Sequence, residues 1–572
     1  MHLIKSTLRK HWHCFIMAIV VGFTISLPSI WIRLDLGERF KGIHIAEIDS
    51  DIFYTQRIKK AYDGNYKLSV SNVEESKNGP YIQPPGGEIF VAVLTKIFGL
   101  RPEQMIEIGN FIFPGLLAII LYALFYSITG SKIVSLLAPV IILLDSNLIF
   151  NKSDILNIFF DQDKVGENSY NRPIHPQISS IFFYLWLFFI YHYYQNKKSY
   201  TIIIAGILLG AFFYTYPFSW ILALTILSFL IFLSLIQKEY VLMRGFLIIF
   251  SIGLFLSVEY WINFYQFHAH PLFEIMKKRF IMYPDRTFMW SDLLFLDLLM
   301  VFFLFFKTRE KEKFYFFLAI IASLILVINQ HVITGIRLFP GHWHWYYAVP
   351  FSAFIFTYTA YKFIKTRKVL LVLSFSFIVF VALFNGYVTQ RTYYSKNKEP
   401  YTNYQRYMGA FDWFNKNSLK GDVVLGDFDF TERLLLYTSN DRYIFTTGDS
   451  FNLIPDERLM HSFFVQLYFD GARADTIDEY INQKTPQFIT LLHGYYLRYT
   501  KKCSECFFPE EIERVKRGYL EFLQNDFEKE LKKYKVDYAV EDTKKDAAYR
   551  FGKYNFMKKI ITINDLNIYK VM

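Results

Sequence analysis

The residues that organise this chain read His44-Ile-Ala-Glu-Ile-Asp-Ser-Asp-Ile-Phe-Tyr-Thr-Gln-Arg57. This stretch follows the first long apolar run and gathers three acids, Glu47, Asp49 and Asp51. Carboxylates that cluster beside a membrane surface either cap a local structure or mark a functional site. The stretch therefore decides how the first outside loop folds and where catalytic chemistry should be sought.

A helix is predicted to follow these acids and to end at Asp63-Gly64. Asp51, Tyr54 and Ile58 stand three and four residues apart, so they would share one face of that helix. Asp49 or Asp51 could act only as the N-cap of the helix. The alternative is a catalytic carboxylate held next to the bilayer, and these residues alone leave both interpretations open.

The composition indicates a membrane protein. The chain has 572 residues, 53% of them hydrophobic and 20% aromatic, and the apolar residues come in long runs. About 20 such residues are needed to cross roughly 30 Å of hydrocarbon. We predict a polytopic α-helical membrane protein with about eleven transmembrane helices. The predicted spans are residues 13–33, 106–128, 133–149, 175–195, 200–217, 218–236, 242–262, 292–307, 314–330, 345–363 and 369–388.

Basic loops predict the orientation. The net charge of +11 comes largely from lysine and arginine in short loops, which indicates topology and no nucleic-acid partner. All but one of the basic loops fall on one side, which is therefore taken as cytoplasmic. An odd number of spans then puts the N-terminus in the cytoplasm and the C-terminal segment outside. The predicted location is the plasma (inner) membrane, in multi-pass form.

The chain is predicted to have two parts. Residues 1–392 form the transmembrane domain, and its outside loops hold most of the ionisable residues. After residue 392, charged residues become frequent and apolar runs shorten, so residues 393–572 are expected to form a soluble extracytoplasmic α/β domain. The outside loops comprise residues 33–105, 150–176, 263–291 and 330–344. The elements expected in the second part are helices at 407–417 and 510–534, strands at 422–426 and 536–540, and a hairpin at 560–563 and 567–571.

Acids in the second outside loop suggest a metal site. Asp161 and Asp163 repeat the spacing of Asp49 and Asp51. Carboxylates from the two loops, Asp51 with Asp161 and Asp163, could share Mg²⁺ or Mn²⁺, because these ions prefer oxygen ligands. The competing interpretation of Asp161-Gln-Asp163 is a solvated turn.

Basic residues of the outside loops suggest a phosphate site. The residues predicted to lie near the outer membrane surface, where the phosphate of a lipid carrier would also lie, are Arg172, His175, Arg337, His342 and His344. Arginine suits the forked binding of phosphate. Contact with lipid headgroups is the competing interpretation for the arginines, and an interfacial aromatic belt is the competing one for the histidines.

Asp49-Ser-Asp-Ile-Phe-Tyr54 with Asp63-Gly64, the many spans and the outside C-terminal part resemble the GT-C superfamily of integral membrane glycosyltransferases. That superfamily includes the oligosaccharyltransferase catalytic subunits. The resemblance implies a sugar donor linked to polyprenyl phosphate or diphosphate, with Asp51 or Asp49 as the catalytic or metal-binding carboxylate. It also matches Asp161 and Asp163 to a second-loop acidic pair. The chain lacks the Trp-Trp-Asp-containing motif of oligosaccharyltransferases, so the acceptor is left as a lipid, glycan or protein.

The chemistry of such a site can be stated independently. Phosphate is a good leaving group. A cation must hold the negative charge of this phosphate as the glycosidic bond breaks. An aspartate can take the proton of the acceptor hydroxyl. Attack opposite the leaving group inverts the anomeric centre. The rival predictions are a membrane transporter, for which we see no sequence repeat, and a non-catalytic membrane scaffold whose acids are only helix caps.

Overall fold

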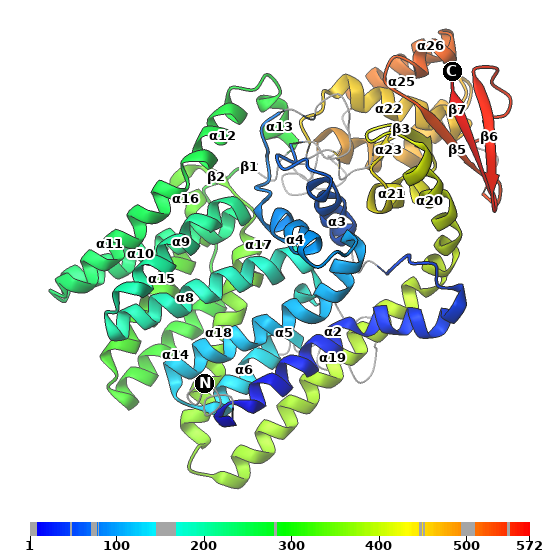
Figure 1. Ribbon diagram of the computed structural model, residues 1–572. Coiled ribbons are helices and arrows are strands. Elements are labelled where there is room, and N and C mark those ends of the chain that lie inside the picture. Colours follow the sequence, from blue (N-terminus) through cyan, green and yellow to red (C-terminus); the bar gives the residue numbers. More distant parts are fainter. Residues whose placement is uncertain are drawn as a thin grey trace.

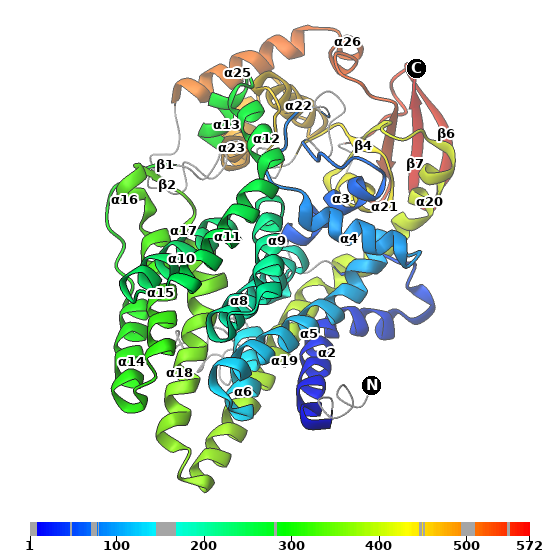
Figure 2. The ribbon, with the colours of Figure 1, turned by 60° about the vertical axis from the view of Figure 1, so that its left-hand side comes forward.

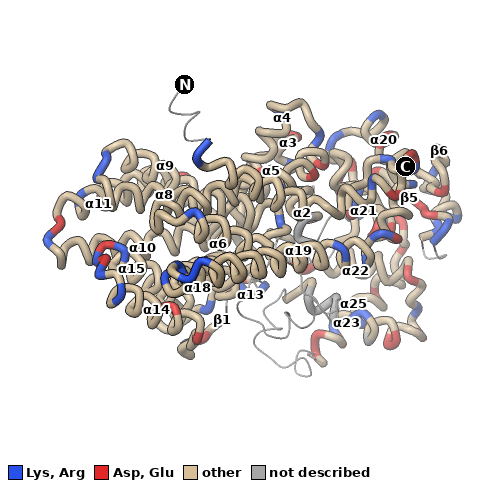
Figure 3. Tube along the Cα trace, turned by 90° about the horizontal axis from the view of Figure 1, so that it is seen from below, with Lys and Arg blue, Asp and Glu red and all other residues tan. Residues whose placement is uncertain are grey.

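The computed structural model is mostly helical and places a bundle of long helices beside a mixed sheet with its own helices (Figure 1). It describes residues 9–45, 49–69, 77, 79–144, 168–279, 283–445, 449, 452–493, 509–545 and 549–572. Figure 2 shows that helices α3 and α4 lie between the bundle and the sheet region. Figure 3 shows charged residues gathered at the ends of the bundle helices and over the sheet region, while most of the bundle carries none.

The bundle helices lie where the apolar runs predict them. Each predicted span overlaps at least one described helix. These helices are α2 (Trp12–Leu36), α5 (Pro102–Thr129), α6 (Lys132–Leu144), α8 (Ser179–Asn196), α9 (Ser199–Thr215), α10 (Pro217–Ile236), α11 (Tyr240–Leu256), α12 (Val258–His268), α14 (Asp292–Thr308), α15 (Lys311–Ile328), α18 (Val349–Ile364) and α19 (Lys368–Tyr404).

Fewer helices meet a strict length and hydropathy requirement for crossing a membrane. Among the described residues there are five, or six if α11 and α12, which meet at an angle of 51°, form one broken span. Helices α6 and α9 are apolar but shorter. The positions of the predicted helices are therefore confirmed, while the count of about eleven spans stays a prediction.

Small residues bring the bundle helices together. A Cβ on Gly22 of α2 would lie 2.4 Å from the carbonyl oxygen of Phe111 on α5, so only glycine fits this crossing. Close approach through small residues is the usual way for membrane helices to pack, because lipid supplies little hydrophobic driving force. The core of the bundle buries large side chains such as Trp186, Phe212 and Phe354.

The chain after α19 forms a five-stranded sheet. Its strand order is β4-β3-β5-β7-β6, and β3 is parallel to both β4 and β5 while β7 is antiparallel to β5 and β6. The strands are β3 (Val423–Gly426), β4 (Asp441–Arg442), β5 (Tyr538–Asp542), β6 (Met557–Ile563) and β7 (Leu566–Val571), and the helices are α20 (Met408–Asn417), α21 (Phe428–Tyr437), α22 (Asp456–Phe469), α23 (Ile477–His493), α25 (Pro509–Gln524) and α26 (Phe527–Leu531).

Most predicted elements of this part are confirmed, with one correction. Both predicted strands, the closing hairpin and the helix at 407–417 are present. The single helix predicted over 510–534 is wrong, because it breaks into α25 and α26. Asp526 caps the second helix by accepting from the Lys529 amide, which starts a new helix at that point. The predicted domain boundary after residue 392 falls inside α19, so the division into two domains stays a prediction.

The other described elements are short helices, turns and strands. They are α3 (Asp49–Tyr62), α4 (Gly86–Ile97), α13 (Phe273–Arg279), α16 (Gln330–Thr334), α17 (Pro340–Trp343), the strands β1 (Tyr283–Pro284) and β2 (Ile336–Arg337), the 3₁₀ turns η1 (Gly37–Arg39), η4 (Ser169–Asn171) and η7 (Gln405–Tyr407), and the π-helical turns η5 (Pro173–Ile178) and η6 (His344–Ala348).

Candidate functional site

Helix α3 is held from two sides, as Figures 1 and 2 show. Ile58 and Ala61 are fully buried in a cluster formed with α4, α5 and η5. The other face meets the sheet region, where Lys60 Nζ lies 2.6 Å from the Asp441 carboxylate and Gln56 donates to the Glu432 carbonyl oxygen. The helix predicted after the first acids is confirmed, and packing fixes its direction.

Asp49 and Asp51 occupy the first turn of α3. The side chains of residues 49–51 lie outside the described part of the chain. Ile52, the residue after Asp51, is buried in one cluster with Ile32 and Leu36 of α2 and Leu434 of α21. The first turn of α3 therefore lies where α2 meets the sheet region.

A buried ion pair folds the first outside loop onto α3. Arg57 Nε lies 2.5 Å from Glu88 Oε1, and the guanidinium also donates to the carbonyl oxygens of Leu68 and Gln83. Glu88 is fully buried. Two residues earlier, a Cβ on Gly86 would lie 2.5 Å from the Tyr214 carbonyl oxygen, so glycine allows the loop to reach the break between α9 and α10.

Breaking this ion pair is expected to cost much of the protein's stability. Arg57→Met would leave the Glu88 carboxylate buried without its partner, which typically costs about 3–5 kcal/mol. Thermal unfolding of the protein in lipid nanodiscs measures the loss. The matched control is Lys197→Met, which breaks the half-exposed pair with Glu239 and should cost less than ~1 kcal/mol. Equal losses in both variants would contradict the proposed role of the buried pair.

Five rings from separate segments meet beside α3, and we call them the histidine–tyrosine cluster. The Tyr54 and His175 ring centroids are 5.2 Å apart, and His175 stacks on Tyr216 at 4.1 Å. The Tyr216 hydroxyl and His342 Nδ1 share a hydrogen bond, and the His342 ring centroid lies 5.5 Å from that of Tyr346. His175 lies in η5 and Tyr346 in η6. His175 itself departs from helical geometry, with φ −123° and ψ 109°, so η5 is kinked at this ring.

Arg172 lies against this cluster, immediately before η5. Its charge acts on Tyr54, Tyr216 and His342. Arg172 Nε and both ring nitrogens of His175 are buried and have no hydrogen-bond partner among the described residues. Buried polar atoms without partners are uncommon. Since Arg172 carries a positive charge, the group that suits this place is an anion with several acceptor oxygens.

His342 is a neutral member of the cluster. Burial, and then the charge of Arg172, lower the pKa of His342 to about 3, from an ordinary value of 6.5. Burial also lowers the pKa of His344. The sequence pointed to both histidines as groups that meet a phosphate. At neutral pH His342 can contact a phosphate as a neutral hydrogen-bond donor, and Arg172 carries the positive charge.

This shift predicts a dependence of stability on pH. Between about pH 6.5 and 3 the unfolded chain binds a proton at His342 and the folded chain does not, so stability should fall as the pH drops through this range. The slope from this group is at most ~1.4 kcal/mol per pH unit. Thermal unfolding against pH should give a shallower slope for His342→Gln than for the unchanged protein. Equal slopes would contradict the buried neutral imidazole.

The other predicted site residues lie in different surroundings. Arg337 in β2 pairs with Asp285 at 2.9 Å, beside the short antiparallel pair of β1 and β2. Hydrogen bonds from Thr287 and then the Arg337 guanidinium lower the pKa of Asp285 to about 2, so the pair is ionised at neutral pH. Asp161 and Asp163 lie outside the described residues. Within the described residues, no group of three or more His, Cys, Asp or Glu is placed to hold a metal ion.

His175 is among the outside basic residues that the sequence predicts near the membrane surface, whereas no sequence pattern assigned a site role to Tyr216 or Tyr346. Tyr216 lies in Tyr214-Thr-Tyr-Pro217, where the proline signals a helix break, and His175 stands between Pro173 and Pro176. These breaks were the available signal. They show that the backbone departs from a regular helix but not which breaks face each other.

No family model matches the chain, and no curated protein gives a significant match. Solved structures similar to it include the Archaeoglobus fulgidus oligosaccharyltransferase tethered with an acceptor peptide containing the NVT sequon, at 12% identity and a TM-score of 0.43 over 94% of this chain and 70% of that one. The Archaeoglobus fulgidus oligosaccharyltransferase in the apo form is also similar, at 12% identity and a TM-score of 0.44 over 93% and 70%. A third is the archaeal oligosaccharyltransferase AglB from Archaeoglobus fulgidus in complex with an inhibitory peptide and a dolichol-phosphate, at 11% identity and a TM-score of 0.44 over 94% and 70%. These structural neighbours belong to the GT-C type of enzyme that the sequence resembles.

Proposed function

We propose that this chain is an inverting membrane glycosyltransferase that takes a sugar from a polyprenyl-phosphate or diphosphate donor on the outer face of the membrane. The observation that carries the proposal is the meeting of Arg172 with the histidine–tyrosine cluster next to α3. A buried guanidinium nitrogen and a buried imidazole, both lacking partners, suit a phosphate. Tyr54 belongs to helix α3. This helix begins with Asp49 and Asp51, one of which would be the carboxylate that the chemistry requires.

In this proposal some residues stabilise the leaving phosphate and others activate the acceptor hydroxyl. Arg172 binds the phosphate and stabilises its growing charge as the bond to the anomeric carbon breaks. His175 and His342 donate hydrogen bonds to the same oxygens. Asp51, or Asp49, accepts the proton of the acceptor hydroxyl as that oxygen attacks from the opposite side. A single displacement of this kind inverts the anomeric centre.

We include in the proposal a divalent cation, Mg²⁺ or Mn²⁺, that Asp51 would hold together with Asp161 and Asp163. When bound, such an ion would help neutralise the leaving phosphate. The described residues do not form a metal site by themselves, so no step above depends on the ion. The acceptor is a lipid, glycan or protein, and the orientation expected from the basic loops, with a cytoplasmic N-terminus, puts the site on the extracytoplasmic side.

The proposal is tested with purified protein in nanodiscs and a panel of polyprenyl-phosphate hexoses and pentoses. At least one donor is expected to lose its sugar to water or to an added membrane acceptor and so to release free polyprenyl phosphate. The transferred sugar should have the anomeric configuration opposite to that in the donor. Heat-treated protein provides the background rate. Tight binding of donors without any release would instead identify a non-catalytic binding protein, and product of retained configuration would exclude the single displacement.

A further inference from the structure

Two basic turns lie at the end of the bundle that points away from α3, as Figures 1 and 2 show. One joins α14 to α15 and the other joins α18 to α19. The sequence predicts this end to be cytoplasmic. With the adjoining ends of their helices, the turns contain eight bases and two acids, which are Lys307, Arg309, Lys311, Lys313, Lys362, Lys365, Arg367 and Lys368, and Glu310 and Glu312.

The two turns contact each other, although α15 to α18 separate them in the chain. Lys362 Nζ lies 3.8 Å from Glu310 Oε1. The rings of Phe303 on α14 and Phe363 on α18 stack with their centroids 4.7 Å apart, and Lys307 Nζ lies 4.3 Å from the centroid of the Phe363 ring. The charges of both turns therefore form one surface, which we call the basic patch.

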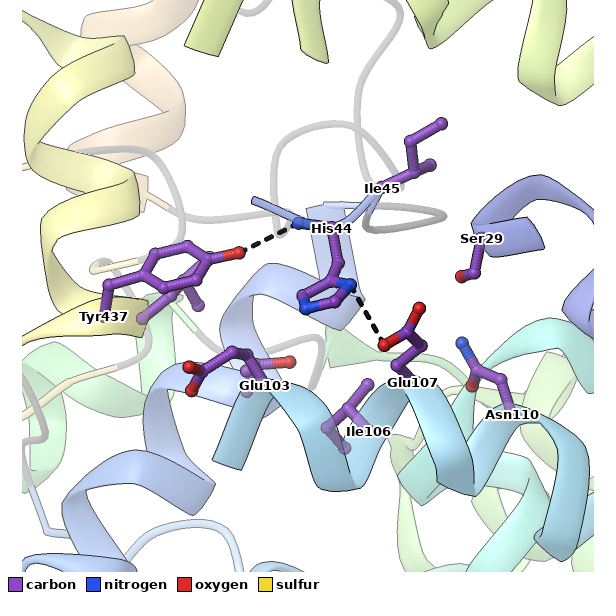
Figure 4. Close-up of a pocket in the computed structure, with 10 residues that line it drawn as sticks. Ser29, His44, Ile45, Glu103, Ile106, Glu107, Asn110 and Tyr437 are labelled. Carbon is purple, nitrogen blue, oxygen red and sulfur yellow. Dashed lines mark hydrogen bonds and ion pairs between the residues drawn. The ribbon is translucent and has the colours of Figure 1, made fainter. Parts of the chain in front are cut away.

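Most cations of the basic patch have no carboxylate beside them. Glu310 pairs with two lysines of the patch, at 2.6 and 3.8 Å. Within the described ranges, six exposed bases have no carboxylate within 4.0 Å, namely Lys307, Arg309, Lys311, Lys365, Arg367 and Lys368. At the other end of the bundle, by contrast, Glu107 contacts both Arg33 and His44, and Figure 4 shows the second of these contacts. The positive charge of the patch is therefore available to an anion from outside the chain.

Exposed aromatic rings lie directly beside these cations. The exposed fractions of Phe303, Phe306 and Phe363 are 40%, 62% and 53%. Arg309 lies over the Phe306 ring, as Lys307 lies over that of Phe363. Because these rings belong to predicted membrane spans, their exposed faces would meet lipid chains. A ligand that uses both the charges and the rings has a negative headgroup and apolar chains.

Basic loops also set the orientation of a membrane protein, and that role alone explains many lysines. Orientation depends on the number of positive charges in each loop and not on contacts between loops. It does not require two turns that pack together, nor exposed rings beside the unpaired charges. These two features favour a bound lipid over orientation alone.

We propose that the basic patch binds an anionic phospholipid, with the headgroup phosphate between the two turns and the acyl chains along Phe303, Phe306 and Phe363. Lysine and arginine form charge-assisted hydrogen bonds with phosphate oxygens. Basic residues at the cytoplasmic ends of spans attract anionic lipids. A soluble anion would use the charges and leave the rings uncovered, so the geometry favours the lipid. The inference does not depend on the proposed transfer reaction.

Native mass spectrometry of the full chain in detergent, with equal amounts of phosphatidylglycerol and phosphatidylcholine of the same chain length, tests the proposal. The protein is expected to retain phosphatidylglycerol at least about tenfold over phosphatidylcholine, because choline adds a positive charge that the patch repels. Each lysine or arginine near an anionic lipid contributes a factor of about five in affinity. A variant with Lys307→Gln and Arg309→Gln, and another with Lys365→Gln and Arg367→Gln, should therefore each lower the ratio at least about fivefold.

The matched control carries Lys198→Gln and Arg244→Gln, which remove two exposed charges from other turns predicted to be cytoplasmic, and it should keep the full ratio. The proposal is overturned if the unchanged protein retains both lipids equally, if either patch variant keeps the full ratio, or if the control loses as much as the patch variants. Displacement of the lipid by an equal concentration of glycerophosphoglycerol, the same headgroup without chains, would identify a soluble-anion site and also overturn it. Arg309→Gln and Arg367→Gln alone replace any double variant that shows no unfolding transition.

Discussion

Asp51→Asn is expected to abolish sugar transfer while leaving the fold intact. Asp51 lies in the first turn of α3, and the rest of that helix is fixed by buried Ile58 and Ala61 and by the Lys60–Asp441 pair. Asparagine caps a helix about as well as aspartate, so the substitution removes the charge and little else. Losing a group that acts only in the transition state typically costs on the order of 100- to 1000-fold in rate.

The measurement is release of polyprenyl phosphate by the purified variant, with the unfolding temperature recorded beside it. Asp49→Asn is the paired variant, because either acid could be the base. One of the two should lose transfer and the other should change it much less. If both variants keep full activity, the acids only cap α3 and the proposed mechanism is wrong. If a variant loses activity together with its unfolding transition, the conclusion is drawn from the other one.

Local patterns in the sequence identify most of the fold. Apolar runs predict the bundle helices, Asp63-Gly64 predicts the end of α3, and alternating residues predict the closing hairpin. The break at Asp526 is missed because the amphipathic spacing of residues continues from α25 into α26. The cap that the Asp526 side chain forms starts a new helix despite this continuous spacing. Helix caps of this kind contribute about 1 kcal/mol, which is enough to start a new helix where burial is weak.

The site is harder to predict because its members are far apart in the chain. Tyr216 and His342 are 126 residues apart and bond each other only because α17 and the start of α10 pack together. In the same way Arg337 and Asp285 are 52 residues apart and meet where β1 pairs with β2, and strands of two residues have no periodicity to signal them. The sequence indicates which residues could bind a phosphate, but which of them share one place depends on how the helices pack.

Arg172 and Arg337 have the same side chain in different surroundings. Replacing each of them in turn is therefore expected to affect sugar transfer very differently. Arg172→Gln is expected to lower kcat/KM for sugar transfer by about 100- to 1000-fold, because the leaving phosphate loses the cation beside it. Arg172→Lys should recover part of this loss but not all, since lysine keeps the charge and loses the forked geometry. Initial rates over a range of donor concentration separate binding from turnover.

Arg337→Gln is the matched control, with the same change of side chain in another outside loop. Arg337 already has the ionised Asp285 at 2.9 Å, so a neighbouring carboxylate balances its charge. Removing the guanidinium should change the rate less than about threefold, while the lost ion pair should lower the unfolding temperature slightly, as expected for a partly exposed pair. The opposite ranking, with Arg337→Gln inactive and Arg172→Gln active, would move the phosphate to the β1–β2 strand pair. The histidine–tyrosine cluster would then be a packing feature of the bundle, because its buried donors would have no anion to bind.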